Sequence, residues 1–187
     1  VDLTIEMLRV FGVSVHDVAD ETQRTIAVSQ TRVTHRELKI EPDASSAVYF
    51  AAVATLHKGL RVTLEGLRLD SLQPDAEAIR LLGTVGADLQ ETELGLQVTG
   101  TGTIRGFGDL DASSFPDASL CLAAVAAVAD SPSRIYGLET LPLKESDRIE
   151  VMARSLAKVG CGVGAGTSDL RITPLQENNG PTAIDPV

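Results

Sequence analysis

Pro42-Asp43-Ala44-Ser45 recurs 74 residues later as Pro116-Asp117-Ala118-Ser119, and this pair of tetrapeptides marks an internal repeat. Two further pairs of segments share the same offset. They are Val85-Gly86 with Val159-Gly160, and Leu96-Gln97-Val98-Thr99 with Leu170-Arg171-Ile172-Thr173. Three marks at one spacing are typical of a duplication in which each copy forms one supersecondary unit.

The segments between these marks follow the same order in both copies. An Ala-rich apolar segment comes first, followed by a β-like stretch, an amphipathic segment that ends at Val-Gly, and a pair of strands. The first three occupy 47–56, 60–64 and 75–86 in one copy, and 120–129, 134–138 and 147–160 in the other. This order predicts an α/β fold of repeated β-α-β-α-β-β units. Because the Ala-rich segments are apolar on most faces, we expect buried helices and outer sheets.

The first 36 residues fit the second half of another copy. An amphipathic helix is predicted to end near Phe11-Gly12, and strands are predicted near 13–17 and 25–29. The chain is therefore expected to hold about two and a half units.

Aspartates are predicted to begin three of the helices. Asp43, Asp117 and Asp147 each stand at the start of a helical pattern, where a carboxylate accepts hydrogen bonds from free backbone N–H groups. Gly160 is predicted to end the last helix. Repeat symmetry should bring the helix starts at Asp43 and Asp117 to one end of the domain, where their N–H groups favour bound anions.

Composition and charge exclude several classes of protein. Apolar residues make up 43% of the 187 residues and charged residues 22%, which rules out disorder. The longest apolar run, Leu120 to Ala129, is too short to span a bilayer, and no signal peptide is visible, so no membrane partner is predicted. The net charge of −10 disfavours nucleic acid as a partner. Any attraction for an anionic substrate must then be local.

The two cysteines indicate the compartment. Cys121 and Cys161 lie inside apolar stretches and are predicted to be buried, reduced thiols of a cytoplasmic protein. The chain has no Cys-x-x-Cys and no cluster of His and Cys, so no metal site is predicted. The chain begins at Val1 rather than Met, and we expect it to be an excised piece of a longer protein.

The strongest chemical signal is Leu143-Lys144-Glu145-Ser146-Asp147-Arg148. Lys144 and Arg148 are candidates for binding an anion beside the helix N-terminus, with Glu145 as a proton carrier. Neighbouring cations would lower the pKa of the Glu145 carboxyl and burial would raise it, and the sequence leaves this balance open. The alternative is a solvated capping segment without a chemical role.

Asp117 is the second candidate. It follows Phe115-Pro116 at a helix start, and a carboxylate facing the same cleft as Glu145 would accept a proton from a substrate hydroxyl. The alternative is again a purely structural cap, with Pro116 fixing the turn before the helix.

At these residues the sequence resembles a known family. Glu41 to Phe50, Phe115 to Ser119 and Leu143 to Arg148, in this order and spacing, resemble the 5-enolpyruvylshikimate-3-phosphate (EPSP) synthase family, and Leu72-Gln73 and Asp75 resemble it too. The resemblance implies two domains of three β-α-β-α-β-β units each, with the active site in the cleft between them. Residues 1–39 would be the end of the first domain and the approach to the hinge. Residues 40–187 would be two units of the second domain, with a third unit incomplete.

The resemblance also implies an activity. The family is a transferase of the shikimate pathway, which makes aromatic amino acids, and it uses no cofactor. It moves the enolpyruvyl group of phosphoenolpyruvate onto the 5-hydroxyl of shikimate 3-phosphate through a tetrahedral intermediate. By resemblance, Asp117 takes the hydroxyl proton and Glu145 handles the methylene proton. Lys144 lies at the shikimate phosphate, Arg148 at the phosphoenolpyruvate phosphate, and Thr140 stands where some members have a substrate-contacting Asn.

Two other functions stay open. One is an enolpyruvyl transferase with another acceptor, although the family acting on UDP-N-acetylglucosamine lacks the Lys-Glu-Ser-Asp-Arg motif. The other is a non-catalytic domain that binds anions or associates with itself, since an incomplete unit leaves apolar surface and sheet edges unpaired. The substrate loops of the family's first domain and its Asp-His-Arg-Met-Ala-type segment do not occur in this sequence. We therefore expect no turnover by this chain alone.

Overall fold

The computed structural model describes residues 1–20, 22–33, 37–176 and 182–184. The packing of the chain divides it into two compact units, Val1–Glu41 and Pro42–Val187. The division lies within two residues of the boundary expected between 39 and 40. The assignment of the two units to the two domains of a larger enzyme stays a prediction.

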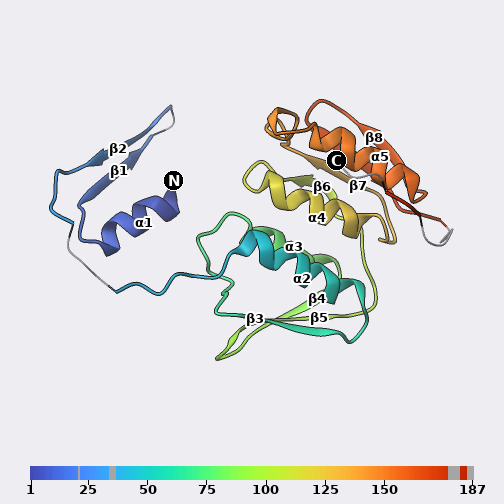
Figure 1. Cartoon of the computed structure of the whole chain (residues 1–187), viewed down its shortest axis with the longest axis horizontal. Helices are drawn as coiled ribbons and strands as arrows, with labels where there is room; N and C mark the ends of the chain where they lie inside the picture. Colours follow the sequence, from blue (N-terminus) through green and yellow to red (C-terminus); the bar gives the residue numbers. More distant parts are fainter. Residues whose placement is uncertain (21, 34–36, 177–181, 185–187) are drawn as a thin grey trace. The chain divides into compact units, whose positions relative to one another are not determined.

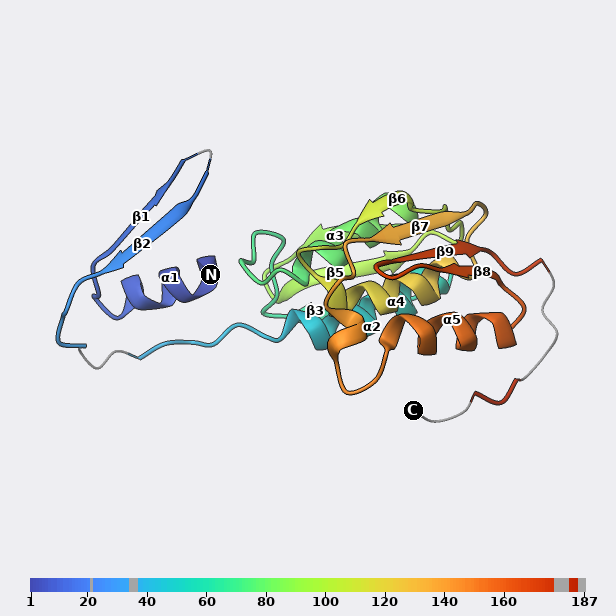
Figure 2. The same cartoon turned by 90° about the horizontal axis from the view of Figure 1, so that it is seen from above.

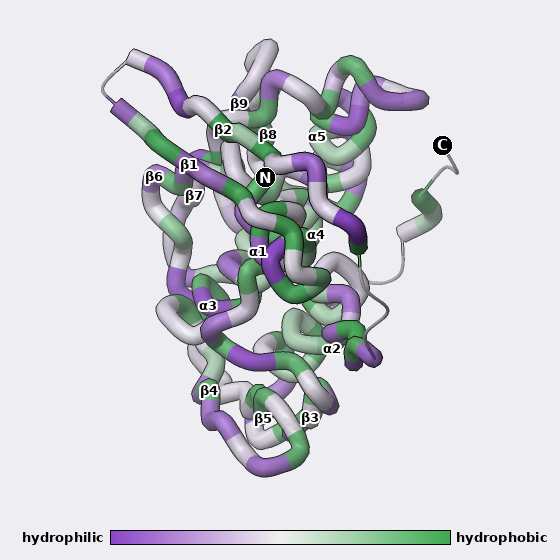
Figure 3. Tube along the Cα trace, turned by 90° about the vertical axis from the view of Figure 1, so that its left-hand side faces the viewer, coloured by the Kyte–Doolittle hydropathy of each residue, from purple (hydrophilic) through white to green (hydrophobic). Residues whose placement is uncertain are grey.

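The first unit is a helix followed by a hairpin. It comprises α1 (Asp2–Val10), β1 (Val15–Ala19) and β2 (Arg24–Val28), and the two strands are antiparallel. Its small core consists of Ile5, Val13 and Val15, with Leu8 packed against it. Hydrophilic and hydrophobic residues both occur along β1 and β2 (Figure 3). The helix and the strand pair predicted from the first 36 residues are confirmed.

The second unit begins with the first full copy of the repeat. Its elements are α2 (Ala44–Leu56), β3 (Arg61–Glu65), α3 (Ala76–Val85), β4 (Ala87–Glu91) and β5 (Gly95–Gly100). The strands form an antiparallel sheet in the order β3-β5-β4. The order of elements is the one that the sequence predicts.

The next copy repeats this arrangement with one more strand. Its elements are β6 (Gly108–Asp111), α4 (Pro116–Ala126), β7 (Ser133–Tyr136), the 3-10 turn η1 (Leu141–Leu143), α5 (Arg148–Lys158), β8 (Gly162–Ala165) and β9 (Asp169–Thr173). The sheet order is β6-β7-β9-β8, with β6 parallel to β7 and the other pairs antiparallel. This copy is a complete β-α-β-α-β-β unit. In the first copy the described residues 37–43 form no strand before α2, and residues 34–36 lie outside the described part of the chain.

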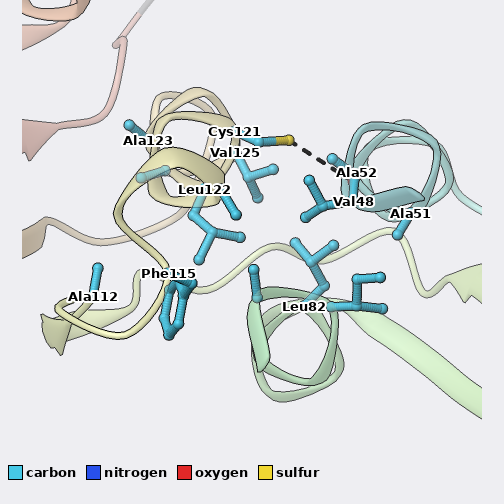
Figure 4. Packing of buried hydrophobic residues seen from close by; sticks show 14 of the residues in the cluster. Val48, Ala51, Ala52, Leu82, Ala112, Phe115, Cys121, Leu122, Ala123 and Val125 are labelled. Carbon is cyan, nitrogen blue, oxygen red and sulfur yellow. Dashed lines mark hydrogen bonds between the residues drawn. The ribbon is translucent and has the colours of Figure 1, made fainter. Parts of the chain in front are cut away.

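The helices of the second unit meet in one apolar core. Val48 and Ala52 of α2, Leu82 of α3 and Leu122 and Val125 of α4 point into the space that the three helices share (Figure 4). Leu82, Leu122 and Val125 are fully buried there. Cys121 and Cys161 are buried free thiols, as predicted from their apolar surroundings.

The α2, α4 and α5 helices lie side by side and run in one direction. Their N-terminal ends lie at the same end of the second unit, with the two sheets along the outside (Figures 1 and 2). This arrangement confirms the alignment expected from the repeat. It also gathers the polar residues that begin each helix.

One prediction about α2 was wrong. The helix is apolar almost all round, but it is not buried on every face, because Tyr49, Phe50, Val53 and Leu56 are exposed to between 37% and 62%. These four residues form one stripe along the helix. Burial of α2 therefore depends on its small residues, such as Ala51 and Ala54, which face the core.

Asp43 caps α2 as predicted. Its carboxylate accepts hydrogen bonds from the backbone N–H groups of Ser45 (3.1 Å) and Ser46 (3.2 Å) and from the Ser46 hydroxyl (2.6 Å). The Ser46 hydroxyl, together with these N–H groups, lowers the pKa of the Asp43 carboxyl. The charged form of Asp43 is therefore the one that stabilises the helix.

Replacing Asp43 with Ala is expected to lower the free energy of unfolding by about 1 kcal/mol at pH 7. Because the pKa is lowered in the folded state, this contribution is complete above about pH 4, the ordinary value of an unfolded Asp. It is lost as the pH falls through the folded-state pKa. Urea denaturation at pH 7 and at pH 2.5 measures both values. Asp43→Asn is the matched control, since Asn caps without titrating, and equal stability of Asp43→Ala and the natural chain at pH 7 would contradict the role.

Candidate active site

Four charged side chains meet where α4 and α5 begin. The Lys144 ammonium lies 3.2 Å from one carboxylate oxygen of Asp117, and Arg148 Nη1 lies 2.8 Å from the other. Arg148 Nη2 lies 3.0 Å from Glu145 Oε2. Arg148 thus bridges two carboxylates from different segments. The structure brings together four of the five residues that the sequence singles out, two cations and two carboxylates.

Asp117 is not the N-cap of α4, and this prediction was wrong. The α4 helix begins at Pro116 after Phe115, so Asp117 lies inside the first turn and makes no capping hydrogen bond. Its sequence equivalent Asp43 lies just before α2 and caps it. The carboxylate of Asp117 is therefore free to pair with the cations of the next segment.

The two helix starts differ in their backbone hydrogen bonds. In the first copy the carbonyl of Pro42 accepts a hydrogen bond from the Gln73 amide at 2.7 Å, and the first helical bond runs from Ala47 N to Asp43 O. In the second copy the carbonyl of Phe115 accepts the first helical bond, from the N–H of Ser119 at 3.2 Å. Pro has no N–H to lose at the first helical position, so the earlier start costs nothing there.

The segment before α5 is held by its own cap. The Asp147 carboxylate accepts hydrogen bonds from the N–H groups of Ile149 (3.0 Å) and Glu150 (3.1 Å), as the sequence predicts. Gly160 follows the end of α5 with a φ of 104°, a conformation that favours glycine. The cap fixes the direction in which the chain from Lys144 to Arg148 meets α4.

Hydrogen bonds lower the pKa of the Glu145 carboxyl. A hydrogen bond from its own backbone N–H, followed by the hydrogen bond from Arg148, holds the pKa of the Glu145 carboxyl below its usual value. The side chain is 84% exposed, so burial does not outweigh these contacts. The question that the sequence leaves open is answered: Glu145 is ionised at neutral pH and is in the form that accepts a proton.

A hollow of about 330 Å³ opens beside the cluster. It is lined by Leu120, Glu145, Ser146, Arg148, Val151, Met152 and Ser155. Glu145 and Arg148 supply its charged wall, and side chains of α4 and α5 supply its apolar wall. Asp117 is not among its lining residues. It forms an ion pair with Arg148, which does line the hollow.

Thr140 does not join the cluster. It precedes η1, its side chain is exposed, and its carbonyl accepts a hydrogen bond from the N–H of Leu143 at 3.2 Å. Among the described residues the ion pairs of the cluster are made without it. A role in binding substrate stays a prediction.

The starts of α2 and α3 are tied together near this end of the unit. The Gln73 carboxamide accepts from the N–H of Ala44 at 2.8 Å and donates to the carbonyl of Pro42, and the Ser45 hydroxyl donates to the carboxylate of Asp75. Sequence reasoning noted Gln73 and Asp75 without giving them a structural role. Because this contact joins residues about 30 positions apart, local pattern contains no signal for it.

The charged cluster suits organic anions. Two cations beside the start of a helix bind phosphate or carboxylate, and two exposed carboxylates accept and return protons. Within the described ranges, no three His, Cys, Asp or Glu side chains gather in a way that would hold a metal ion. Among these same residues, no helix has the length and apolar character needed to cross a membrane.

Comparison with known proteins identifies the family. The family model described as EPSP synthase (3-phosphoshikimate 1-carboxyvinyltransferase) matches residues 1–185. The chain belongs to the EPSP synthase family. The 3-phosphoshikimate 1-carboxyvinyltransferase of Idiomarina loihiensis is 34% identical over 94% of this chain, and that of Methanoculleus marisnigri is 36% identical over 99%. The chain spans about 40% of the length of these relatives.

Solved structures agree with this membership. An EPSP synthase from Acinetobacter baumannii is similar with a TM-score of 0.73 and 26% identity, over 97% of this chain and 42% of that one. The enolpyruvyl transferase NikO from Streptomyces tendae has a TM-score of 0.62 and 17% identity, over 92% of this chain and 40% of that one. The second similarity shows the fold alone. The repeated unit with inner helices is thus the EPSP synthase family fold.

Replacing Arg148 with Ala is expected to raise the pKa of Glu145 toward its ordinary value, because the carboxylate loses a hydrogen-bond donor and a neighbouring cation. Carbon-detected NMR titration of the side-chain carboxyl measures the change. Arg134→Ala is the control, since Arg134 pairs with Asp109 and Asp169 on the outer sheet. A Glu145 titration that is the same in both variants would show that Arg148 does not lower the pKa of this carboxyl.

Proposed function

We propose that this chain contributes the Lys144–Arg148 wall of an enolpyruvyl transferase that joins phosphoenolpyruvate to the 5-hydroxyl of shikimate 3-phosphate. Family membership supports the reaction. The single observation that carries the proposal for these residues is the bridge of Arg148 between Asp117 and Glu145. It joins the two proton carriers to a cation at the rim of a hollow.

Each residue of the cluster has a proposed step. Asp117 takes the proton of the acceptor hydroxyl as the oxygen attacks C2 of phosphoenolpyruvate, and Glu145 in its protonated form gives its proton to C3, which yields the tetrahedral intermediate and leaves Glu145 as the carboxylate. The C2–O bond to phosphate then breaks, phosphate leaves with the electron pair, and Glu145 removes a proton from the C3 methyl group. Lys144 and Arg148 bind the phosphate groups of the two substrates.

The ionised state of Glu145 suits the second half of this reaction. A carboxylate with a lowered pKa is ready to accept the proton that leaves the methyl group. To donate in the first half it must be protonated. An anionic substrate beside it favours that form, because a like charge raises a carboxyl pKa.

The proposed ligands carry more negative groups than the cluster has cations. Shikimate 3-phosphate and phosphoenolpyruvate each bear a carboxylate and a phosphate, whereas the cluster of described residues supplies Lys144 and Arg148. Two anions held together without further cations repel each other. We infer that this chain binds one substrate at a time and does not turn over alone. A phosphate-release assay of the isolated chain checks this, and turnover at the rate of a complete enzyme would refute it.

Binding of shikimate 3-phosphate to the isolated chain tests the site. We expect Arg148→Ala and Lys144→Ala to weaken binding about tenfold each, because each removes a charge-assisted hydrogen bond. Binding should also weaken as salt is added. Isothermal titration calorimetry measures the affinities.

Arg171→Ala is the matched control for these variants, since Arg171 is a largely exposed cation on β9. UDP-N-acetylglucosamine is the competing ligand. If that compound binds and shikimate 3-phosphate does not, the acceptor is different. If inorganic phosphate binds equally well and neither acceptor binds, the chain is an anion-binding domain.

We also infer that the chain works in the cytoplasm. Burial raises the pKa of the Cys121 thiol to about 11 and raises that of Cys161, so both stay protonated and unreactive at neutral pH. Free, buried thiols fit a reducing compartment.

A further inference from the structure

The β3 strand lies at the edge of its sheet. It pairs with β5 on one side, in the order β3-β5-β4 (Figure 3). In the second copy the equivalent strand, β7, has β9 on one side and β6 on the other. On β3 the side that corresponds to β6 has no strand among the described residues. The same fold therefore pairs this edge in one copy and leaves it open in the other.

Three residues of β3 direct their backbone polar groups to the open edge. The even-numbered residues face β5, since the carbonyl of Leu60 and the N–H of Gly66 bond to the β5 segment at 3.0 and 2.8 Å. Successive residues of an antiparallel strand bond to alternate sides, so Arg61, Thr63 and Glu65 face away from β5. No residue that the structure describes hydrogen-bonds their backbone groups. Such groups are a template for another strand.

The residues of β3 are complementary to themselves in an antiparallel pairing. They read Arg61-Val62-Thr63-Leu64-Glu65. If Thr63 lies opposite Thr63 of a second copy, each Arg61 lies opposite a Glu65, and each Val62 lies opposite a Leu64. Opposite charges, paired hydroxyls and apolar pairs in these positions all stabilise an antiparallel pair. This register also joins the three residues that face the open edge.

The two charges of β3 are available for such a pairing. Arg61 and Glu65 are exposed, and neither forms an ion pair with another residue in the described part of the chain. The strand also contains no Pro, Gly or Lys, the residues that commonly protect an edge from association. Charge complementarity therefore favours a second copy of this chain as the partner.

A hollow of about 290 Å³ lies beside the same edge. Its walls include Ala47 and Phe50 of α2 and Leu64 and Glu65 of β3. Phe50 is 62% exposed. A strand added along β3 would bring its apolar side chains next to Leu64 and shield Phe50 from water, which favours association. The hollow and the open edge thus form one surface.

We propose that β3 is the interface of a symmetric dimer of this chain. The two β3 strands pair antiparallel across a two-fold axis at Thr63, and the two three-stranded sheets become one continuous sheet. Identical strands that pair antiparallel in this register are related by a two-fold axis, the commonest symmetry of dimers. The inference does not depend on the proposed function.

Amide hydrogen exchange distinguishes a second copy from another occupant of the edge, a strand from elsewhere in the same chain. A second copy protects the N–H groups of Arg61, Thr63 and Glu65 only at concentrations where the dimer forms. A strand of the same chain protects them at every concentration. We expect their exchange, followed by NMR, to slow as the protein concentration rises.

Arg61→Glu and Glu65→Arg test the pairing itself. Each variant places like charges opposite each other at two positions of the dimer, so we expect each to associate at least tenfold more weakly than the natural chain. An equal mixture of the two variants should associate again, because each strand then meets a strand of opposite charge. Sedimentation velocity over a range of concentrations measures all three samples.

Two exposed residues away from β3 provide matched controls. Arg154→Glu on α5 and Glu93→Arg between β4 and β5 make the same changes of charge, and both variants should associate like the natural chain. Thermal melting shows that each variant is folded. Restored association in the mixture also excludes misfolding as the cause of the loss.

Several results would contradict the proposal. One is a natural chain that stays monomeric up to millimolar concentration, and if its three edge amides are still protected, a strand of the same chain occupies the edge. Another is a dimer that neither charge reversal weakens, which would have its interface elsewhere, such as the exposed stripe of α2. A mixture of the two variants that does not associate would rule out the register.

Discussion

Where a helix begins decides which of its carboxylates is free. The two copies of the repeat share the sequence Pro-Asp-Ala-Ser, yet α2 begins after its aspartate and α4 begins before it. In the first copy the carboxylate of Asp43 serves the backbone, whereas in the second the carboxylate of Asp117 meets Lys144 and Arg148. The charged cluster exists because this one aspartate has no capping bond to make.

The rest of the second unit holds this cluster in place. The core shared by α2, α3 and α4 sets the spacing of the helices, and the cap at Asp147 sets the approach of the Lys144–Arg148 segment. Arg148 then joins α4 to the start of α5 through two carboxylates. Since all four charged groups are at least one-third exposed, their mutual attraction adds little to stability.

Much of this arrangement could be predicted from the sequence. The offset of 74 residues predicts the order of elements, and the charged residues picked out around Lys144 and Asp117 lie together in the structure. The different starts of α2 and α4 could not be predicted, because the start of α2 is held by Gln73, which lies 31 residues from Pro42 in the sequence and bonds to its carbonyl. The exposed stripe of α2 was missed for a related reason. The hydropathy of a residue does not show whether another part of the chain packs against it. The lowered pKa of the Glu145 carboxyl depends on a backbone hydrogen bond and on the position of the Arg148 guanidinium, which spacing alone does not fix.

The different helix starts also bear on how a duplicated protein acquires chemistry. When a gene segment is duplicated in tandem, both copies inherit the same side chain. Only one copy then has to keep the structural role of that side chain. Here Asp43 caps the first helix, and the equivalent Asp117 makes no capping bond and pairs with two cations instead. An internal duplication can thus provide within one polypeptide the freedom that is usually attributed to paralogous genes.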